Sequence, residues 1–180
     1  MPFGTSESGF RGEVEAEQSL QRGERLLAMI ENYEHHDLCG PAAGEAEERL
    51  NNLQRSRAYT GSVVTDPRRL LRIMRSEDPH IYLGQFVTCV YNPDKALCRR
   101  QLAAAGDQTM PDLANCRPLQ CRNVALTAEN LKALTNQLHQ LDTHLARADL
   151  LAPYVAHRLT KQRRDLAALL DAASPSKDTL

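Results

Sequence analysis

Four cysteines within one short stretch are the residues of this chain best suited to metal chemistry. Eight residues separate Cys89 from Cys98, four separate Cys116 from Cys121, and 17 lie between the two pairs. Two pairs of thiolates brought together from loops can hold zinc in a tetrahedron. The spacing therefore predicts a zinc site. The alternatives are an iron–sulfur cluster, which also takes four thiolates, and thiols that are buried or free without a metal.

Arginines flank all of these cysteines except Cys89. Positive charge beside a thiol lowers its pKa and favours the thiolate, the form that binds metal. We therefore expect these arginines to promote metal binding, and they are also candidate contacts to DNA phosphates. They are Arg99, Arg100, Arg117 and Arg122. A second group of candidate DNA contacts lies near the C-terminus and comprises Arg158, Lys161, Arg163 and Arg164.

The segment that must position the cysteines has little regular pattern. Residues 81–91 form a short segment that is rich in β-branched and aromatic residues, which is typical of a strand. Residues 92–123 carry three prolines and a glycine and are expected to be irregular. A loop of this length needs a cross-link to hold it, and bound metal would supply one. Cys39 stands apart and is expected to be a small buried residue.

Helical patterns occupy the N-terminal part of the chain. The spacing of apolar residues predicts a first helix over 12–37, although Gly23 weakens the pattern. A second helix is predicted over about 41–57. Asp66-Pro67 is typical of an N-cap followed by the first helical residue, so a third helix is predicted over about 67–76. Its four arginines are expected to form a solvated face.

The clearest pattern lies in the C-terminal part. Five leucines recur at spacings of three and four, which is a heptad seam, and Thr127 is a plausible N-cap. After Pro153 a second apolar stripe follows. Two such helices joined by a short connection favour an antiparallel hairpin, with one helix kinked at Pro153 as the alternative. The two stripes consist of Leu131, Leu134, Leu138, Leu141 and Leu145, then Val155, Leu159, Leu166 and Leu169.

The fold class expected from these patterns is mainly α. We expect a helical segment over 1–80, a cysteine-rich knuckle with little strand over 81–124, a helical hairpin or coiled coil over 125–173 and a disordered tail over 174–180. The chain has 22 basic and 23 acidic residues, and the basic excess lies after residue 60. No signal peptide or membrane span is expected, so a cytoplasmic location without a membrane partner is the default.

Motifs that would indicate an enzyme are few. His144 and Arg147 spell the H-x-x-R pair of tyrosine recombinase active sites, and Tyr154 follows. We interpret this as an accident, because the pair flanks a seam leucine on an exposed helix. The sequence has no P-loop, zinc-protease or nucleophile-elbow motif. We therefore expect no enzymatic activity and no small-molecule substrate.

Several short elements resemble actinobacterial tyrosine recombinases over almost the whole chain. They are the opening Gly4-Thr5-Ser6-Glu7-Ser8-Gly9-Phe10, Gly40-Pro41-Ala42-Ala43, the element from Cys89 to Cys98, and Cys116-Arg117-Pro118-Leu119-Gln120-Cys121-Arg122-Asn123. In that family the first element follows the catalytic tyrosine. The tyrosine would fall near Pro2, which is no nucleophile, and the residues that clamp the phosphate would precede Met1.

The resemblance therefore implies a recombinase C-terminal tail without its catalytic domain. The function expected is a non-catalytic binding module of DNA integration or recombination, which contacts DNA or contacts a recombinase or other protein through its C-terminal helices. The alternative is a structural coiled-coil interaction module whose cysteines are inert.

Overall fold

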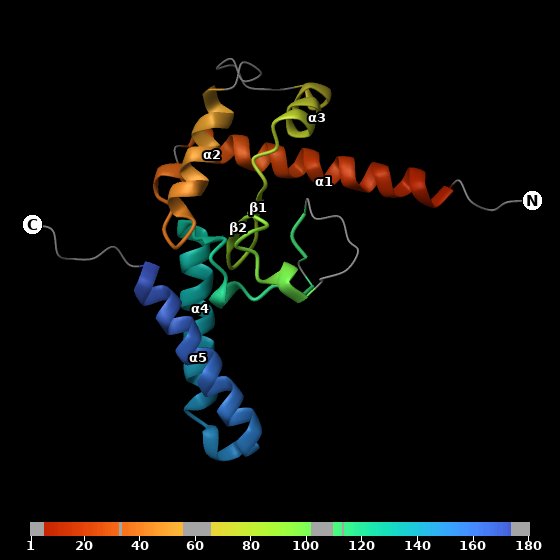
Figure 1. The fold of residues 1–180 in the computed structure, drawn as a ribbon. Helices are drawn as coiled ribbons and strands as arrows, with labels where there is room; N and C mark the ends of the chain where they lie inside the picture. Colours follow the sequence, from red (N-terminus) through yellow and green to blue (C-terminus); the bar gives the residue numbers. More distant parts are fainter. Residues whose placement is uncertain (1–5, 33, 56–65, 102–109, 113, 174–180) are drawn as a thin grey trace, which may run out of the picture.

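The computed structural model describes residues 6–32, 34–55, 66–101, 110–112 and 114–173 (Figure 1). These residues are mostly helical and include one small antiparallel sheet of three strands in the order β1-β2-β3, so the expectation of a mainly α chain is confirmed. The tail over 174–180 lies outside the described residues. The α-helices are α1 (Ser6–Glu31), α2 (Ala43–Arg55), α3 (Pro67–Ser76), α4 (Ala128–Leu145) and α5 (Pro153–Ala173). The strands are β1 (Ile81–Leu83), β2 (Thr88–Val90) and β3 (Val124–Ala125).

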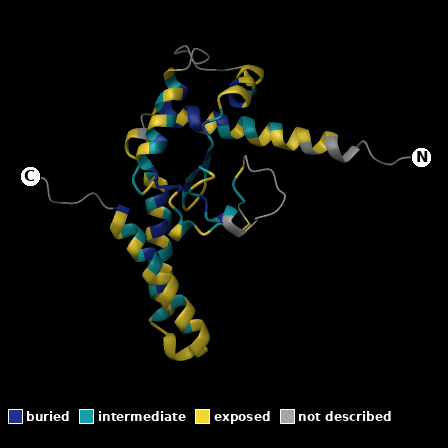
Figure 2. Cartoon of the chain, viewed as in Figure 1, coloured by how far each residue is buried: buried dark blue, intermediate teal, exposed yellow. Residues whose placement is uncertain are grey.

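Helix α1 begins and ends about six residues earlier than the apolar pattern predicts. Its N-terminal half projects from the body of the molecule, while its C-terminal half packs against α3 and buries Leu26 and Ile30 (Figures 1 and 2). Gly23 lies in this contact. A Cβ at Gly23 would stand 2.9 Å from Cγ of Met74 and 3.1 Å from a methyl carbon of Leu70. Gly23 therefore allows the close approach of the two helices.

Helix α3 spans the residues that the sequence predicts. Its N-cap is Asp66, whose carboxylate accepts a hydrogen bond from the backbone N–H of Arg68 at 3.1 Å. One side of the helix is buried against α1, and the other side is exposed. The predicted solvated face is thus confirmed. The buried residues are Leu70, Ile73 and Met74, and the exposed arginines are Arg68, Arg69, Arg72 and Arg75.

The single strand expected over 81–91 is wrong. The segment forms a hairpin, in which β1 and β2 pair with Tyr82 opposite Cys89. The chain turns between them at Gly84, whose N–H donates to the carbonyl of Val87 at 3.0 Å. A Cβ at Gly84 would lie 2.6 Å from that carbonyl oxygen, so a side chain would block the turn. The third strand, β3, pairs with β2 and begins directly after the stretch 92–123 that was expected to be irregular.

The irregular segment after β2 is attached to α2 by polar contacts. Glu45 accepts hydrogen bonds from Lys95 at 2.7 Å, from Arg49 at 2.5 Å and from the Asn92 amide at 3.3 Å. Arg49 also donates to the backbone carbonyls of Pro79 and Tyr91, each at 3.0 Å. These ionic contacts supply part of the cross-linking that the sequence interpretation assigned to a metal.

Helices α4 and α5 pack against each other through leucines (Figure 1). Thr127 is the N-cap of α4 as predicted, and it forms a capping box with Asn130. A short 3-10 turn, η4 (Ala148–Leu150), connects the two helices before Pro153 begins α5. Leu134 and Leu141 are buried at the contact, whereas Leu138 is half-buried and Val155 is exposed.

The sheet lies between two apolar cores. Ala125 belongs to a core formed with α1, α2 and α3, and Val124 belongs to a core formed with α4 and α5. Adjacent residues of a strand point to opposite faces, so β3 contributes to both. None of the described helices is both long and apolar enough to cross a lipid bilayer.

Candidate functional site

The four predicted metal ligands lie in one region of the fold. Cys89 is in β2, Cys98 begins the short 3-10 helix η2 (Cys98–Gln101), and Cys116 and Cys121 lie on either side of η3 (Pro118–Gln120). Burial, followed by the nearby thiols of Cys116, Cys121 and Cys98 in that order, raises the pKa of the Cys89 thiol to about 12. This mutual effect places the four side chains near one another.

The prediction of a bound zinc ion or iron–sulfur cluster is nevertheless wrong. In the part of the chain that the structure describes, no three His, Cys, Asp or Glu side chains are arranged to hold a metal ion. A tetrahedral zinc site needs four deprotonated sulfurs about 2.3 Å from one point, a much stricter condition than proximity. Cys98 and Cys89 instead pack with Tyr91, Ala96 and Tyr82 in a small apolar cluster. They serve there as small apolar residues.

The expected lowering of the thiol pKa by a flanking arginine is also wrong for Cys116, and the pKa of Cys89, which no arginine flanks in the sequence, is raised as well. Burial raises the pKa of Cys116, and the neighbouring Cys121, Cys98 and Asp112 raise it further. At Cys89 the cation that opposes this rise is Arg49 of α2, and its effect ranks below those of burial and of the other three thiols. Both thiols therefore favour the protonated form more strongly than an ordinary cysteine does.

Cys39, expected to be a small buried residue, is half-buried beside β3. It forms an isolated antiparallel bridge with Leu126, and its thiol donates to the Leu126 carbonyl at 3.6 Å. Burial raises its pKa.

The arginines around the cysteines do not form one exposed group. Arg117 and Arg122 are exposed, whereas Arg99 is half-buried and interacts with other residues. The side chain of Arg100 lies outside the described residues. Only Arg117 and Arg122 are therefore placed at the surface as candidate DNA contacts.

The second predicted group of cations lies on the solvent side of α5. Arg158, Lys161 and Arg164 are exposed and follow one another at intervals of three residues, which places them along one side of the helix. Arg163 is also exposed, but its Nε donates to the Asp142 carboxylate of α4 at 2.6 Å. Arg163 thus holds α5 on α4, and Nε of Arg164 lies 3.8 Å from the carboxylate of the adjacent Asp165.

The H-x-x-R pair is exposed, and so is the tyrosine after it. His144 lies in the last turn of α4, Arg147 lies in the connection, and Tyr154 is 74% exposed at the start of α5.

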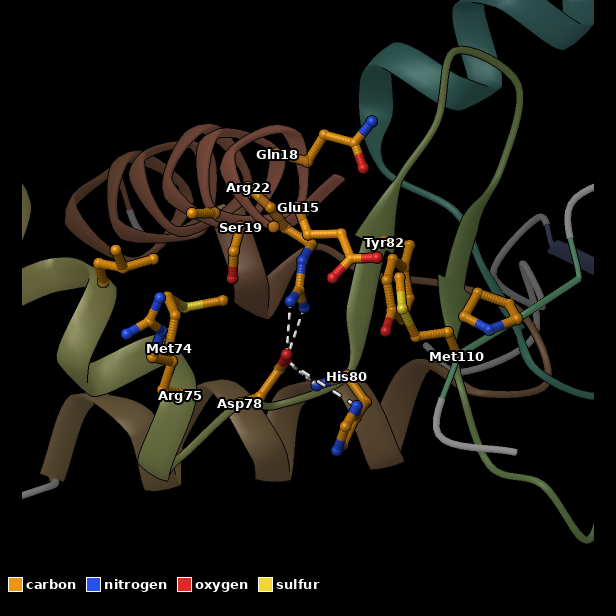
Figure 3. A pocket seen from close by; sticks show the side chains of 14 residues that line it. Glu15, Gln18, Ser19, Arg22, Met74, Arg75, Asp78, His80, Tyr82 and Met110 are labelled. Carbon is orange, nitrogen blue, oxygen red and sulfur yellow. Dashed lines mark hydrogen bonds and ion pairs between the residues drawn. The ribbon is translucent and has the colours of Figure 1, made fainter. Parts of the chain in front are cut away.

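A cleft that sequence reasoning missed lies between α1, the end of α3 and β1 (Figure 3). Its volume is about 530 Å³, and Ser19, Arg22, Met74, Asp78 and Tyr82 are among the residues that line it. The lining residues come from α1, from the chain between α3 and β1 with the ends of both elements, and from Met110 and Pro111. Because these segments are far apart in the sequence, no local motif could have indicated the cleft.

An ion pair crosses the inner wall of this cleft. Arg22 binds the Asp78 carboxylate with two hydrogen bonds, one of them 2.6 Å long, and its guanidinium lies 4.6 Å from the centre of the Tyr82 ring. Asp78 also accepts from the backbone N–H of His80 at 2.7 Å. The charges of Arg22 and Asp78 neutralise each other. The pair therefore ties α1 to the segment between α3 and β1.

Two further groups of the cleft have unusual surroundings. Burial raises the pKa of Tyr82 to about 12, so its phenol is a weak nucleophile at neutral pH. His80 has a φ of 52°, and the described residues offer no hydrogen-bond partner to its buried Nδ1. Its Nδ1 lies 4.0 Å from Asp78. The strained backbone of His80 turns the chain so that its N–H reaches Asp78.

The ion pair between Arg22 and Asp78 makes the free energy of unfolding depend on pH in the acid range. Although burial opposes it, the hydrogen bonds and charge of Arg22 hold the pKa of Asp78 below its ordinary value. A lowered folded-state pKa gives stability that is complete above the unfolded-state pKa, about 3.9, and is lost as pH falls through the folded-state value. We expect Asp78→Asn to cost about 1–3 kcal/mol at pH 7.

This cost should shrink as the pH is lowered below about 4. Urea unfolding of both proteins between pH 7 and pH 2.5 measures it. A cost that stays constant over the whole range would show that the carboxylate charge contributes nothing. Asp94→Asn, an exposed change away from the cleft, is the matched control.

Comparisons of the chain with protein-family models, with curated proteins and with solved structures found no match. The similarity to tyrosine recombinases therefore rests on the short sequence elements alone, and the family stays a prediction.

Proposed function

We propose that the chain is a non-catalytic DNA-binding module of a DNA integration or recombination system. The observation that carries the proposal is the cationic stripe of α5, formed by Arg158, Lys161 and Arg164. All three side chains are exposed. No acidic residue lies between Pro153 and Arg164, and Asp165, which follows directly, has its carboxylate 3.8 Å from Nε of Arg164. Cations at the surface of one helix bind phosphates with release of counterions, largely without regard to base sequence.

In this proposal α4 and α5 act as a helical hairpin that presents the stripe. Leu134 and Leu141 of α4 pack with Leu166 of α5 in one core, and Arg163 adds an ion pair to Asp142. This packing favours a DNA-binding hairpin over the alternative of a coiled-coil interaction module, because Leu134 and Leu141 of the α4 seam are already buried within the chain. A recombinase that binds the same DNA is the partner that the sequence resemblance implies.

The proposal predicts salt-dependent binding to duplex DNA that relies on α5. Each phosphate contact contributes about 0.9 to the slope of log affinity against log salt concentration. Replacing Arg158, Lys161 and Arg164 with glutamine should therefore reduce the slope by about 2–3 and weaken binding at least about tenfold at 0.1 M salt. Fluorescence anisotropy with a labelled 30-base-pair duplex measures both quantities.

The matched control removes three exposed cations elsewhere, with the same change of net charge. Arg55, Lys132 and Arg147 are exposed on α2, on α4 and in the connection after α4. Their replacement with glutamine should leave the slope within about 1 of the parent protein. Equal slopes for the α5 variant and the parent protein would refute the assignment to α5. A parent protein without salt-dependent binding would refute the function.

A further inference from the structure

A second cationic surface lies on α3, at the far end of the molecule from the tip of the α4–α5 pair (Figure 1). Arg68, Arg72 and Arg75 are exposed there. Their spacing of four and three residues places them along one line of the helix surface. With a rise of 1.5 Å per residue, the line is about 10 Å long. The helix itself, Pro67–Ser76, contains no acidic residue.

The geometry of α3 holds this line rigidly against the body of the protein. Leu70, Ile73 and Met74 are buried on the opposite side, where Gly23 of α1 allows Leu70 and Met74 to approach closely. The acidic residue that precedes the helix, Asp66, is engaged as its N-cap. Within the described residues, no ion pair neutralises Arg68, Arg72 or Arg75.

The spacing and the polarity of this surface fit a nucleic acid backbone. One strand of duplex DNA carries a phosphate about every 3.4 Å along the helix axis, so about 10 Å of arginines faces about three phosphates. An anionic membrane fits less well. Helices that bind membranes insert an apolar face into lipid, whereas the apolar face of α3 is already buried against α1.

We infer that the line of Arg68, Arg72 and Arg75 on α3 is a second phosphate-binding surface for duplex DNA, separate from the stripe on α5. The inference rests on the proposed function and deepens it. A module with cationic surfaces at both ends contacts the backbone at two places.

The test replaces Arg68, Arg72 and Arg75 with glutamine in the full chain. Glutamine is a good helix former, so α3 should be retained. Circular dichroism and the thermal midpoint verify the fold. Anisotropy with the labelled 30-base-pair duplex should show a slope smaller by about 2–3 and binding at least about tenfold weaker at 0.1 M salt. The variant that lacks Arg55, Lys132 and Arg147 is again the control.

Each outcome decides between the two surfaces. A smaller slope for the α3 variant, with the control unchanged, supports the inference, whatever the α5 variant does. A smaller slope for the α5 variant alone overturns the inference and leaves the proposed function standing. A parent protein that binds no duplex overturns both. Binding to phosphatidylserine vesicles without binding to duplex DNA would also overturn the inference and would make α3 a membrane-binding surface.

Discussion

Replacing Asn130 with alanine is expected to lower the free energy of unfolding by about 3–5 kcal/mol. The Asn130 side chain is almost completely buried, with 2% exposed. Its Oδ1 accepts from the Thr88 hydroxyl at 3.0 Å and from the Thr127 backbone N–H at 3.1 Å. Its Nδ2 donates to the carbonyls of Gly84 and Gln85 at 2.8 and 3.1 Å.

The expected cost is large because alanine removes all four hydrogen bonds at once. The buried Thr88 hydroxyl would lose its acceptor, and an unsatisfied buried polar group costs about 1–3 kcal/mol. The N-terminus of α4 would also lose half of its capping box, and the turn between β1 and β2 would lose its attachment to α4. Urea unfolding followed by circular dichroism measures the change.

Two comparison variants distinguish the effect on stability of losing the hydrogen-bond network from the effect of losing any asparagine. Asn136→Ala, at an exposed position of the same helix, should change stability by no more than about 0.5 kcal/mol. Asn130→Asp keeps the acceptors but turns a carboxylate oxygen toward the Gly84 and Gln85 carbonyls, so it should destabilise nearly as much as alanine. If Asn130→Ala behaved like Asn136→Ala, the network would have no role in stability.

The role of Asn130 shows what the sequence can and cannot predict. The N-cap at Thr127 is a local signal and is confirmed, as is the N-cap at Asp66. The bonds from Asn130 to Thr88 and to the hairpin turn join residues more than 40 positions apart. Nothing in the local pattern around Asn130 indicates such partners, so its burial could not be predicted.

The strand prediction failed for a related reason. Residues 81–91 contain the β-branched and aromatic residues of a sheet, and the sheet is present. The reversal of the chain between β1 and β2 depends on Gly84, whose lack of a side chain leaves room for the Val87 carbonyl. Gly23 is a similar case. In the sequence Gly23 only weakens a helical pattern, whereas in the fold it allows α3 to pack closely against α1. A glycine that allows close packing can be recognised only once its neighbour is known.

The cysteine prediction separates proximity from coordination. Clustering in the sequence indicated that the four side chains come together, and their effects on the pKa of Cys89 agree. Spacing does not determine whether sulfurs point to a common centre or into an apolar cluster. Cys98, 8% exposed, packs beside Tyr91 and Ala96. The cleft at Arg22 and Asp78 was missed because its residues lie 56 positions apart.

Replacing Leu141 with alanine is expected to cost about 2–5 kcal/mol in the free energy of unfolding. Leu141 is 3% exposed and lies with Leu134 and Leu166 in the core between α4, α5 and the sheet. Removing three side-chain carbons there loses the free energy gained by burying them. It also leaves a cavity, because the neighbouring leucines of both helices are already packed in place. Urea unfolding measures the change, and an unaltered m-value would show that the denatured state is unaffected.

Leu138 is the matched control, because it lies on the same helix one turn earlier. The heptad pattern alone gives it the same importance, but the structure leaves it half-buried. Leu138→Ala should therefore cost less, about 1–2 kcal/mol, because part of its apolar surface is already in contact with water. Equal costs at the two positions would contradict the observed packing of α5 on α4. They would imply instead that a partner helix covers Leu138, as expected for the coiled-coil alternative.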